Sequence, residues 1–438
     1  MGRCHVLHSS PVRQKIVALV DCNNFYVSCE RVFHAALQKK PVVVLSNNDG
    51  CIVARSNEAK KLGIKMGQPV FQCQDIIRKH HVQVFSSNYS LYADMSARVM
   101  KVLAQFTSQL EVYSIDEAFL DLTDCTHENL TELGHEIRAS VLQRTGIPVS
   151  VGIASSKSLA KIATETAKKQ AASEGVVNLC GLTEQDIDAY LAAIPIEDVW
   201  GIGRKYALFL NNYGIATARD LKYADAKWVR RHLTVVGERL VFELRGTACL
   251  PIESEPKSKK GIMCSKTFGR EISNFQQLQE AIATYTARAA EKLRGQETQA
   301  TALSVFVQTN RFNTAIPYYT NSYDIALPYP TSFTPDLIQY ALTGLKAIYR
   351  EGYRYKKAGV YLTKIVPEEH IQPDLFGEFS LLDHYRQARL MFILDALNTI
   401  YGRDALFFAI QGVTRPWKMH QSKLSGRFTT QWSEILSL

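Results

Sequence analysis

Two adjacent carboxylates interrupt an otherwise apolar, β-forming stretch, and this feature most restricts how the chain can fold. The stretch runs from Val112 to Leu120, with Asp116 and Glu117 in its middle. Burying adjacent carboxylates is costly unless a cation or hydrogen-bond donors compensate them. On an ideal strand the two side chains would point to opposite faces, whereas at a hairpin bend both can face one side.

A third carboxylate, Asp21, ends another buried strand. The run from Ile16 to Val20 is continuously apolar, which is typical of a buried strand. A bend at Asp116 and Glu117 would let all three carboxylates converge. Oxygen-only ligands suit Mg²⁺, and two such ions about 4 Å apart can stabilise the attacking and leaving oxygens of a phosphoryl transfer. The alternative is a solvated turn at Asp116 and Glu117, with Asp21 as a helix cap.

The remaining pattern predicts an α+β protein of several domains. Strands are expected at 42–45, 51–54 and 149–153, with a hairpin turn at 47–50, and helices at 56–62, 90–106, 130–145 and 157–169. Together they indicate a palm-like core around one sheet. Short helices follow to Gly246, and then a polar linker near 253–261. A second α+β unit is expected at 263–366, and an amphipathic helix at 383–400.

Length and composition exclude some classes of protein. The chain has 438 residues, enough for three or four domains, and its net charge of +9 fits a polyanionic partner without requiring one. Its nine cysteines are scattered without a C-x-x-C pair, which disfavours a disulfide framework or a zinc ribbon. No apolar run approaches the roughly 20 residues of a membrane helix. We therefore expect a cytoplasmic protein without a membrane span.

Four motifs, in order, resemble those of Y-family DNA polymerases. Two resemble the palm motifs: Asp21-Cys-Asn-Asn-Phe-Tyr26 and Tyr113-Ser-Ile-Asp-Glu-Ala-Phe-Leu120. The segments 51–63 and 151–161 resemble two further family motifs, and the resemblance covers at least residues 16–365. The segment 47–55 and the C-terminal tail are similar to the UmuC branch, the catalytic subunit of polymerase V-like enzymes, rather than to the DinB branch.

The resemblance implies a right-hand polymerase fold and an activity. The palm would comprise residues 15–35 and 89–181, the fingers 36–88, and the helical thumb, with a helix-hairpin-helix, 182–247. A linker at 248–262 would lead to an α+β little finger at 263–366 and a clamp- and partner-binding tail at 367–438. The implied activity is error-prone translesion DNA synthesis, in which deoxynucleotides are added to a primer 3′-end opposite damaged bases, in SOS-type damage tolerance.

The family pattern also implies roles for the residues of the reaction centre. Asp21, Asp116 and Glu117 would hold two Mg²⁺ ions, with the main-chain carbonyl of Cys22 as an extra ligand. Tyr26 would be the steric gate that excludes ribonucleotides, with the ring of Phe25 beside it. The alternative for both rings is an ordinary place in the core.

Lys60 and Lys168 occupy family positions that contact the triphosphate, where cations offset charge on the leaving pyrophosphate. The sequence departs from many relatives here, because Asn57 stands where a tyrosine is common and Lys60 where an arginine is common. Lysine provides a point charge instead of a bidentate fork. A solvated helix face is the alternative for three further lysines: Lys157, Lys161 and Lys169.

Two regions are expected to hold primer-template DNA. Gly201 and Gly203, followed by Arg204 and Lys205, match a helix-hairpin-helix, in which amide groups at a helix N-terminus bind a phosphate. A plain turn is the alternative. Residues 257–311 contain nine Lys and Arg against four Asp and Glu, and resemble the little finger that grips the duplex in a salt-sensitive way. An ordinary basic surface is the alternative there.

The last part of the chain indicates protein partners. Gln372, Leu375 and Phe376 resemble the short peptide that docks on the bacterial sliding clamp. The segments 415–419 and 424–430 resemble the UmuC C-terminus, which implies a processed UmuD-type dimer, a RecA filament and a nucleoid-associated enzyme.

Two other functions compete with the polymerase. A DNA-binding scaffold that has lost catalysis is disfavoured by the presence of all three carboxylates. A palm-fold nucleotidyl cyclase is disfavoured by the helix-hairpin-helix and the clamp peptide.

Overall fold

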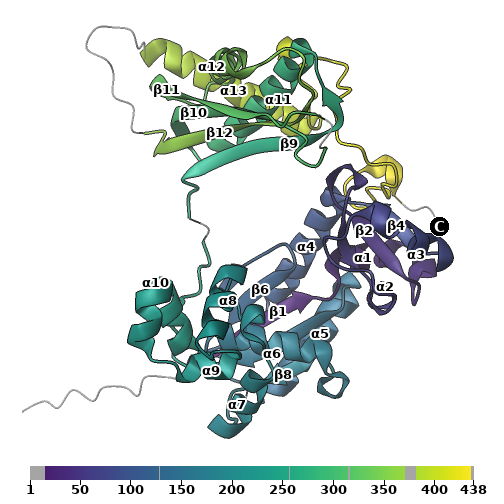
Figure 1. The fold of residues 1–438 in the computed structure, drawn as a ribbon, viewed down its shortest axis with the longest axis vertical. Coiled ribbons are helices and arrows are strands. Elements are labelled where there is room, and N and C mark those ends of the chain that lie inside the picture. Colours follow the sequence, from purple (N-terminus) through teal and green to yellow (C-terminus); the bar gives the residue numbers. More distant parts are fainter. Residues whose placement is uncertain (1–14, 128, 256, 314–315, 370–380, 436–438) are drawn as a thin grey trace, which may run out of the picture. The chain divides into compact units, whose positions relative to one another are not determined.

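The chain forms two compact units in the computed structural model, which describes residues 15–127, 129–255, 257–313, 316–369 and 381–435 (Figure 1). The first unit comprises Met1–Leu45, Cys51–Pro256 and Lys423–Leu438. The second comprises Ser46–Gly50 and Lys257–Ser422. No helix of the described residues is both long and apolar enough to cross a membrane.

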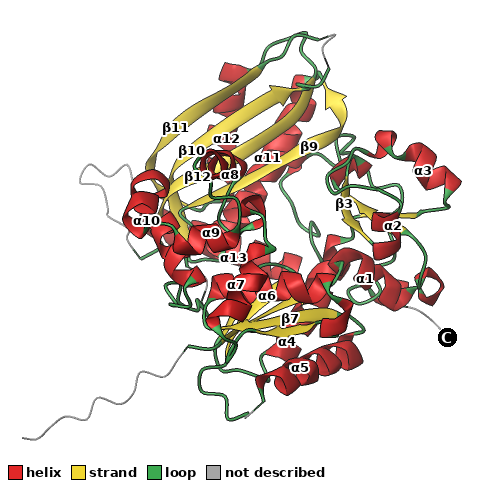
Figure 2. Ribbon diagram, turned by 60° about the horizontal axis from the view of Figure 1, so that its bottom comes forward, coloured by secondary structure: helices red, strands yellow, loops and turns green. Residues whose placement is uncertain are grey.

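A five-stranded sheet forms the centre of the first unit (Figure 2). Its strands, in the order β5-β6-β1-β7-β8, are β5 (Leu110–Val112), β6 (Glu117–Asp121), β1 (Val17–Cys22), β7 (Val149–Ala154) and β8 (Val176–Asn178). The helices α4 (Tyr89–Leu103) and α5 (Leu130–Thr145) cover one face, and α6 (Lys157–Lys169) covers the other. The expected hairpin at the acidic pair is confirmed, since β5 and β6 pair antiparallel.

Strand alternation decides which face of this sheet each side chain reaches. Ala18 and Val20 of β1 belong to the core under α4 and α5, whereas Val17 and Leu19 belong to the core under α6. Because successive residues of a strand point to opposite faces, Asp21 points to the α6 side. The sheet therefore presents this carboxylate to a helix rich in lysine.

A smaller sheet follows the first helix of the chain. The helix α1 (Phe25–Phe33) leads to a sheet of order β3-β2-β4, with β2 (Val42–Leu45), β3 (Ile52–Arg55) and β4 (Gln83–Ser86). The predicted hairpin of β2 and β3 is confirmed. The helices α2 (Asn57–Lys61) and α3 (Gln74–Lys79) accompany this sheet. The buried Ser56 caps α2 by accepting a hydrogen bond from the N–H of Ala59.

Four helices complete the first unit: α7 (Glu184–Ala192), α8 (Arg204–Asn212), α9 (Ala218–Tyr223) and α10 (Ala226–Leu244). Their apolar faces share one core with α6. Capping boxes at Thr183 and Thr217 define the starts of α7 and α9. This helical part is thereby packed against α6, the helix that covers the Asp21 face of the sheet.

The second unit is a four-stranded antiparallel sheet with helices. The strands are ordered β11-β10-β12-β9: β11 (Thr320–Thr331), β10 (Thr298–Thr309), β12 (Tyr355–Pro367) and β9 (Gly261–Ile272). The helices α11 (Phe275–Arg294) and α12 (Thr334–Ile348) share its core. The helix α13 (Leu381–Ile400) is tied to α11 by an ion pair between Arg294 and Asp395.

Short 3₁₀ helices connect several of these elements. They are η1 (Ala35–Leu37), η2 (Asn47–Asp49), η3 (Val70–Gln72), η4 (Ala171–Ser173), η5 (Ile196–Asp198), η6 (Ala409–Gln411) and η7 (Trp432–Glu434). The division of the chain into two units does not separate a palm, fingers and thumb within the first unit. The limits of these three domains therefore stay a prediction.

Candidate active site

Two of the three predicted carboxylates are direct cross-strand neighbours. Asp21 at the end of β1 pairs in register with Glu117 at the start of β6. Each carboxylate meets a lysine of α6: the Lys168 Nζ donates to Asp21 Oδ2 at 2.6 Å, and the Lys161 Nζ donates to both Glu117 oxygens at 2.7 and 2.8 Å. The ammonium groups therefore supply the compensating charge that the buried carboxylates need.

The two carboxylates respond differently to this setting. Burial, and after it a hydrogen bond with Glu117, raises the pKa of Asp21 to about 8. Burial alone would also raise the pKa of Glu117, but hydrogen bonds with Asp21 and Lys161 lower it below its usual value. Burial therefore opposes ionisation more strongly at Asp21 than at Glu117.

Asp116 stands in the turn between β5 and β6, where Ser114 holds it. The Ser114 Oγ donates to Asp116 Oδ1 at 2.5 Å and accepts the backbone N–H groups of Asp116 and Glu117 at 3.1 Å. The Cys22 N–H donates to the Asp116 carbonyl at 2.9 Å, which joins this turn to the end of β1. The turn thus holds Asp116 beside the strand end that carries Asp21.

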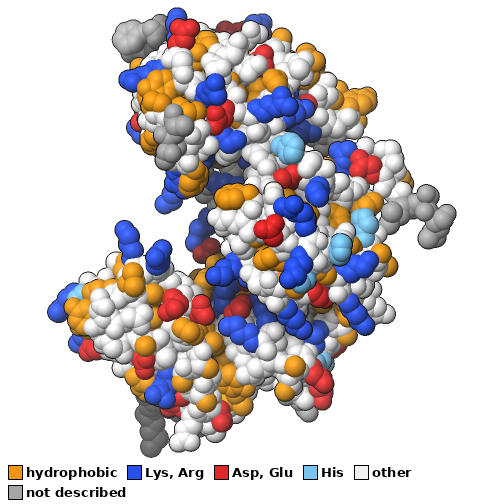
Figure 3. Space-filling model, turned by 45° about the vertical axis from the view of Figure 1, so that its right-hand side comes forward, with side chains coloured by type: hydrophobic (Ala, Val, Ile, Leu, Met, Phe, Trp, Pro, Cys, Tyr) orange, Lys and Arg blue, Asp and Glu red, His pale blue; other side chains and the backbone are white. Residues whose placement is uncertain are grey.

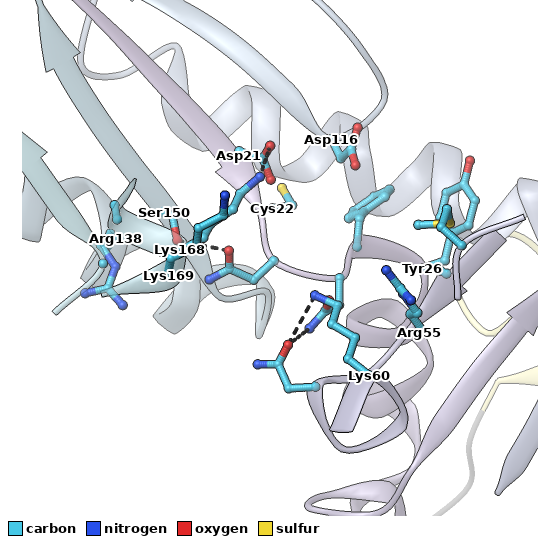
Figure 4. Close-up of a pocket in the computed structure, with 18 of the residues that line it drawn as sticks. Asp21, Cys22, Tyr26, Arg55, Lys60, Asp116, Arg138, Ser150, Lys168 and Lys169 are labelled. Atoms are coloured by element: carbon cyan, nitrogen blue, oxygen red, sulfur yellow. Dashed lines mark hydrogen bonds and ion pairs between the residues drawn. The ribbon is translucent and has the colours of Figure 1, made fainter. Parts of the chain in front are cut away.

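Asp21 and Asp116 line one pocket of about 910 Å³ within the first unit (Figure 4). Figure 4 shows both carboxylates on one side of this pocket, and Lys60 and Arg55 coming from the opposite side. Burial, and then repulsion from Arg55 and Lys168, lowers the pKa of Lys60. The pocket therefore combines acidic oxygens with several cations, an arrangement suited to an anionic ligand and a metal ion.

Three further cations line the pocket and were not predicted: Arg55, Arg138 and Lys169. Arg55 is the last residue of β3 and donates to the backbone carbonyl of Ile64. The Arg138 Nε donates to the carbonyl of Val149 at 2.8 Å. Arg55 lies within the segment 51–63, which resembles a family motif, so the sequence contained a signal for this residue. Arg138 belongs to α5 and reaches the pocket only through folding.

Tyr26 and Phe25 begin α1 at the edge of the pocket, and both line it. Phe25 is also buried in the main core, so its ring serves packing as well. Tyr26 is half-buried, and its ring lies flat against that of Tyr92, with centroids 4.4 Å apart and planes at 14°. The ring of Tyr26 is consequently supported from one side by a buried aromatic residue.

The donor groups suit a divalent ion in their chemistry. Asp21, Asp116 and Glu117 offer only oxygen atoms, the ligands that Mg²⁺ prefers. Among the residues described, no three acidic, histidine or cysteine side chains are gathered as a ready cation site. Asp21 and Glu117 are paired with lysines instead. Binding of a cation would require these ion pairs to rearrange.

The lysines of α6 do not form a simple solvated face. Lys157 is buried, and its Nζ donates to Glu111 and, at 2.7 Å, to the Pro251 carbonyl. Lys161 is tied to Glu117, as described above. A solvated helix face was the alternative for Lys157, Lys161 and Lys169. Of these three lysines, only Lys169 is exposed, and it lines the pocket.

The predicted helix-hairpin-helix lies at the start of α8. Gly201 adopts φ +91°, a conformation that favours glycine, and Gly203 precedes the first turn of α8 without a side-chain cap. Arg204 and Lys205 are both exposed at this helix N-terminus. Open amide groups next to two cations are suited to a phosphate.

Basic side chains occur on both units, and several gather where the surface of the first unit is hollowed (Figure 3). The proposed clamp residues Gln372, Leu375 and Phe376 lie outside the described residues.

Comparison with solved structures defines the class of fold. A Y-family DNA polymerase chimera of Dbh and Dpo4 matches with a TM-score of 0.64 and 24% identity, over 80% of this chain and 99% of that one. An insertion ternary complex of Dbh DNA polymerase matches with a TM-score of 0.54 and 23% identity, over the same shares. The fold, with carboxylates meeting in its central sheet, is that of a Y-family DNA polymerase.

Sequence comparison then identifies the family. The sequence model of the impB/mucB/samB family matches residues 20–165, and that of its C-terminal domain matches residues 259–375. Protein UmuC of Salmonella typhimurium is 46% identical over 96% of this chain and 99% of that protein. Protein ImpB of Salmonella typhimurium is 42% identical over 95% and 98%, and DNA polymerase IV 1 of Bacillus subtilis is 28% identical over 68% and 71%. The chain belongs to the impB/mucB/samB family, and it is of the UmuC type.

Proposed function

We propose that the pocket lined by Asp21, Asp116 and Tyr26 is where this chain carries out error-prone translesion DNA synthesis. The chain is a DNA-directed DNA polymerase of SOS-type damage tolerance, with primer-template DNA and deoxynucleoside triphosphates as its partners. One observation carries the placement: two carboxylates face cations across a single pocket of about 910 Å³. Such a pocket can hold the triphosphate and the metal ions that accompany it.

A polymerase of this class depends on a divalent metal. We assign two Mg²⁺ ions to Asp21, Asp116 and Glu117, with the main-chain carbonyl of Cys22 as an additional ligand. When bound, such ions stabilise charge on the attacking and leaving oxygens of the phosphoryl group. The chain's own contribution is to present the carboxylate oxygens at the strand ends and in the turn between β5 and β6, where Ser114 orients Asp116. Lys161 and Lys168 compensate the negative charge of the carboxylates when no metal ion is bound.

The cations of the pocket would bind the incoming nucleotide. Lys60 and Lys168 are assigned to the triphosphate, and Arg55 joins them because it lines the same pocket. The negative charge of a triphosphate would oppose the burial and the repulsion that lower the pKa of Lys60. Tyr26 would stack under the deoxyribose and exclude a 2′-hydroxyl, with Phe25 beside it.

The two units would share the task of holding DNA. Gly201, Gly203, Arg204 and Lys205 are proposed to bind a backbone phosphate at the start of α8. The second unit is proposed to be the little finger, and the domain limits derived from the sequence remain our proposal for palm, fingers and thumb. DNA binding of this kind does not depend on sequence and weakens with salt.

Partner proteins complete the proposal. The peptide containing Gln372, Leu375 and Phe376 is assigned to the sliding clamp, with the two apolar side chains as anchors. A processed UmuD-type dimer and a RecA filament are assigned to the tail. These assignments rest on the family resemblance and place the enzyme at the nucleoid.

Primer extension with purified protein, Mg²⁺ and deoxynucleotides tests the reaction centre. Asp116→Ala removes a carboxylate of the pocket, so we expect the rate of extension to fall by more than about a hundredfold. Loss of a group that only supports a metal ligand costs up to about a hundredfold, and loss of a ligand itself should cost more. DNA binding should survive. Asp75→Ala is the control, because Asp75 is fully exposed on α3 and pairs only with Arg78 at 3.3 Å in the described part of the chain.

The outcomes separate the competing functions. Full extension by Asp116→Ala would exclude the assignment of Asp116 to the metal site. A scaffold would bind primer-template but would not extend it with or without the UmuD-type and RecA partners. A cyclase would convert a nucleoside triphosphate without a template. Extension across a lesion, with the partners added, is therefore the most informative form of the assay.

A further inference from the structure

A buried carboxylate lies one helical turn after the proposed gate. Glu30 is on α1, four residues after Tyr26, and is completely buried. Its Oε1 accepts the Tyr92 hydroxyl at 2.7 Å and the Ser425 hydroxyl at 2.9 Å. Its Oε2 is buried and has no hydrogen-bond partner among the described residues. A buried carboxylate with so few donors depends strongly on each of them.

This carboxylate determines where the ring behind Tyr26 can lie. Tyr92, on α4, is fully buried, and its hydroxyl donates its hydrogen bond to Glu30. The same ring is stacked on Tyr26. Because packed aromatic rings move together in a dense interior, a shift of the Tyr92 hydroxyl would move the surface on which Tyr26 rests.

The third member of the cluster comes from the far end of the chain. Residues 423–435 belong to the first unit, and several contacts hold them in one register. The Ser86 N–H donates to the Lys423 carbonyl at 2.9 Å, and the Asn88 Nδ2 donates to the carbonyls of Ser425 and Gly426, both at 3.1 Å. These hydrogen bonds to the backbone carbonyls around Ser425 therefore hold its hydroxyl against Glu30.

An aromatic contact adds to this attachment. Phe428 stacks on Phe33 of α1, with ring centroids 4.9 Å apart and planes at 24°, and meets His34 edge-on at 5.5 Å. The segment thus contacts α1 at two places, a buried carboxylate and an apolar ring.

We propose that the C-terminal segment 423–435 is a positioning element for sugar selection, acting from Ser425 through Glu30 and Tyr92 on Tyr26. Ser425, Glu30 and Tyr92 are positioning residues, because none of them lines the pocket. The proposal rests on the gate function proposed for Tyr26. It assigns to the end of the chain a role inside the polymerase itself, in addition to any role in binding partners.

Single-nucleotide insertion on an undamaged primer-template, with the full-length chain, tests this proposal. The kcat/KM is measured for a deoxynucleotide and for the matching ribonucleotide. Ser425→Ala removes one donor from Glu30, so the preference for the deoxynucleotide should fall about threefold to tenfold, the effect of one hydrogen bond. The change should come mainly from a lower KM for the ribonucleotide, while kcat for the deoxynucleotide is retained.

A matched control comes from the same segment. Ser433→Ala makes the same substitution at an exposed serine, eight positions after Ser425, whose hydroxyl accepts from Gln431 at 3.0 Å. Its selectivity should equal that of the unchanged protein. Phe428→Ala loosens the segment without touching the carboxylate, and should lower selectivity as Ser425→Ala does.

A double-mutant cycle identifies the route of the effect. Tyr92→Phe removes the other donor to the same oxygen, so its combination with Ser425→Ala should be non-additive. In a Tyr26→Ala background, Ser425→Ala should change nothing further, because the ring that it positions is gone. Additive effects, or a full effect of Ser425→Ala without Tyr26, would overturn the proposal.

Failure of the proposal can be told apart from failure of the gate. If Tyr26→Ala leaves sugar selection unchanged, the proposed function of Tyr26 is wrong. If Tyr26→Ala admits ribonucleotides but Ser425→Ala and Phe428→Ala do not alter selectivity, only the positioning role is wrong. An equal loss of activity with both nucleotides after Ser425→Ala would also reject it, since that indicates a purely structural contact.

Discussion

At the scale of single residues, the site is dominated by carboxylates that the fold buries and then neutralises. Asp21 and Glu117 are cross-strand neighbours, and they accept hydrogen bonds from Lys168 and Lys161, respectively. Ion pairs of this kind reduce the cost of burial that either partner alone would incur. The same lysines can serve an anionic ligand once another cation compensates the carboxylates. Charge compensation thus explains why α6 carries lysines at these positions.

Sugar selection by Tyr26 is predicted to depend on its ring and not on its hydroxyl. Tyr26→Ala opens the space under the sugar, so discrimination against ribonucleotides should fall by about a hundredfold, the scale at which a site rejects one added hydroxyl. Tyr26→Phe keeps the ring and should keep selectivity. Insertion kinetics with both nucleotides measures this, and unchanged selectivity in Tyr26→Ala would remove the gate role.

At the scale of elements, the packing of α6 against β7 decides where those lysines lie. A Cβ atom added at Gly152 of β7 would stand 2.2 Å from the Thr164 N and 2.4 Å from the Ala160 carbonyl, both in the backbone of α6. Thr164 also donates its hydroxyl to the carbonyl of Leu19 on β1 at 3.1 Å. The helix therefore sits directly on the backbone of the sheet, which only glycine permits at this point.

Gly152→Ala should consequently be costly. Backbone atoms cannot yield as a flexible side chain can, so we expect a loss of about 3 kcal/mol in the free energy of unfolding, the upper end of overpacking. Urea unfolding measures this. Gly295→Ala is the control, since its nearest neighbour would be 3.4 Å away, and it should change stability by less than about 1 kcal/mol. Equal stability of the two variants would contradict the close packing of α6.

At the scale of the whole molecule, two units have separate cores, and the chain passes from one to the other at four points. One of these points lies in the segment expected to be a linker, 248–262. Its first residues are attached to the first unit, because the N–H groups of Cys249 and Leu250 donate to Glu243. The polar composition indicated a linker near 253–261, and the boundary between the units falls at Pro256 and Lys257. If each unit binds DNA as proposed, the affinity for primer-template should reflect the sum of many phosphate contacts.

The contribution of the first unit to DNA binding can be measured through salt dependence. Removing both cations with Arg204→Ala and Lys205→Ala should weaken primer-template binding and reduce the slope of log K against log salt by about 1 to 2. The control removes two exposed charges from α4, Arg98→Ala with Lys101→Ala, on the sheet face opposite α6. If both double variants show the same slope, the helix-hairpin-helix is not a phosphate site.

Local patterns were sufficient to predict several helices and strands. The apolar periodicity of α5 and α6 and the turn residues between β2 and β3 act within a few residues, so they can be recognised without the fold. The acidic pair marked the β5 to β6 hairpin for the same reason. The strand β11 was not predicted, because Pro328 and Pro330 and its many exposed residues obscure a strand pattern.

The sequence by itself determined the family and the class of reaction, because ordered motifs carry that information locally, whereas its assignment of the oxygen donors stays a prediction. Only the tertiary structure decided that Glu117 faces Asp21, that Lys157 is buried and that Arg138 reaches the pocket. It also decided that Ser425 donates to Glu30, 395 positions away. Contacts of this kind depend on how a helix packs on a sheet and where a chain end docks, and no local pattern specifies either.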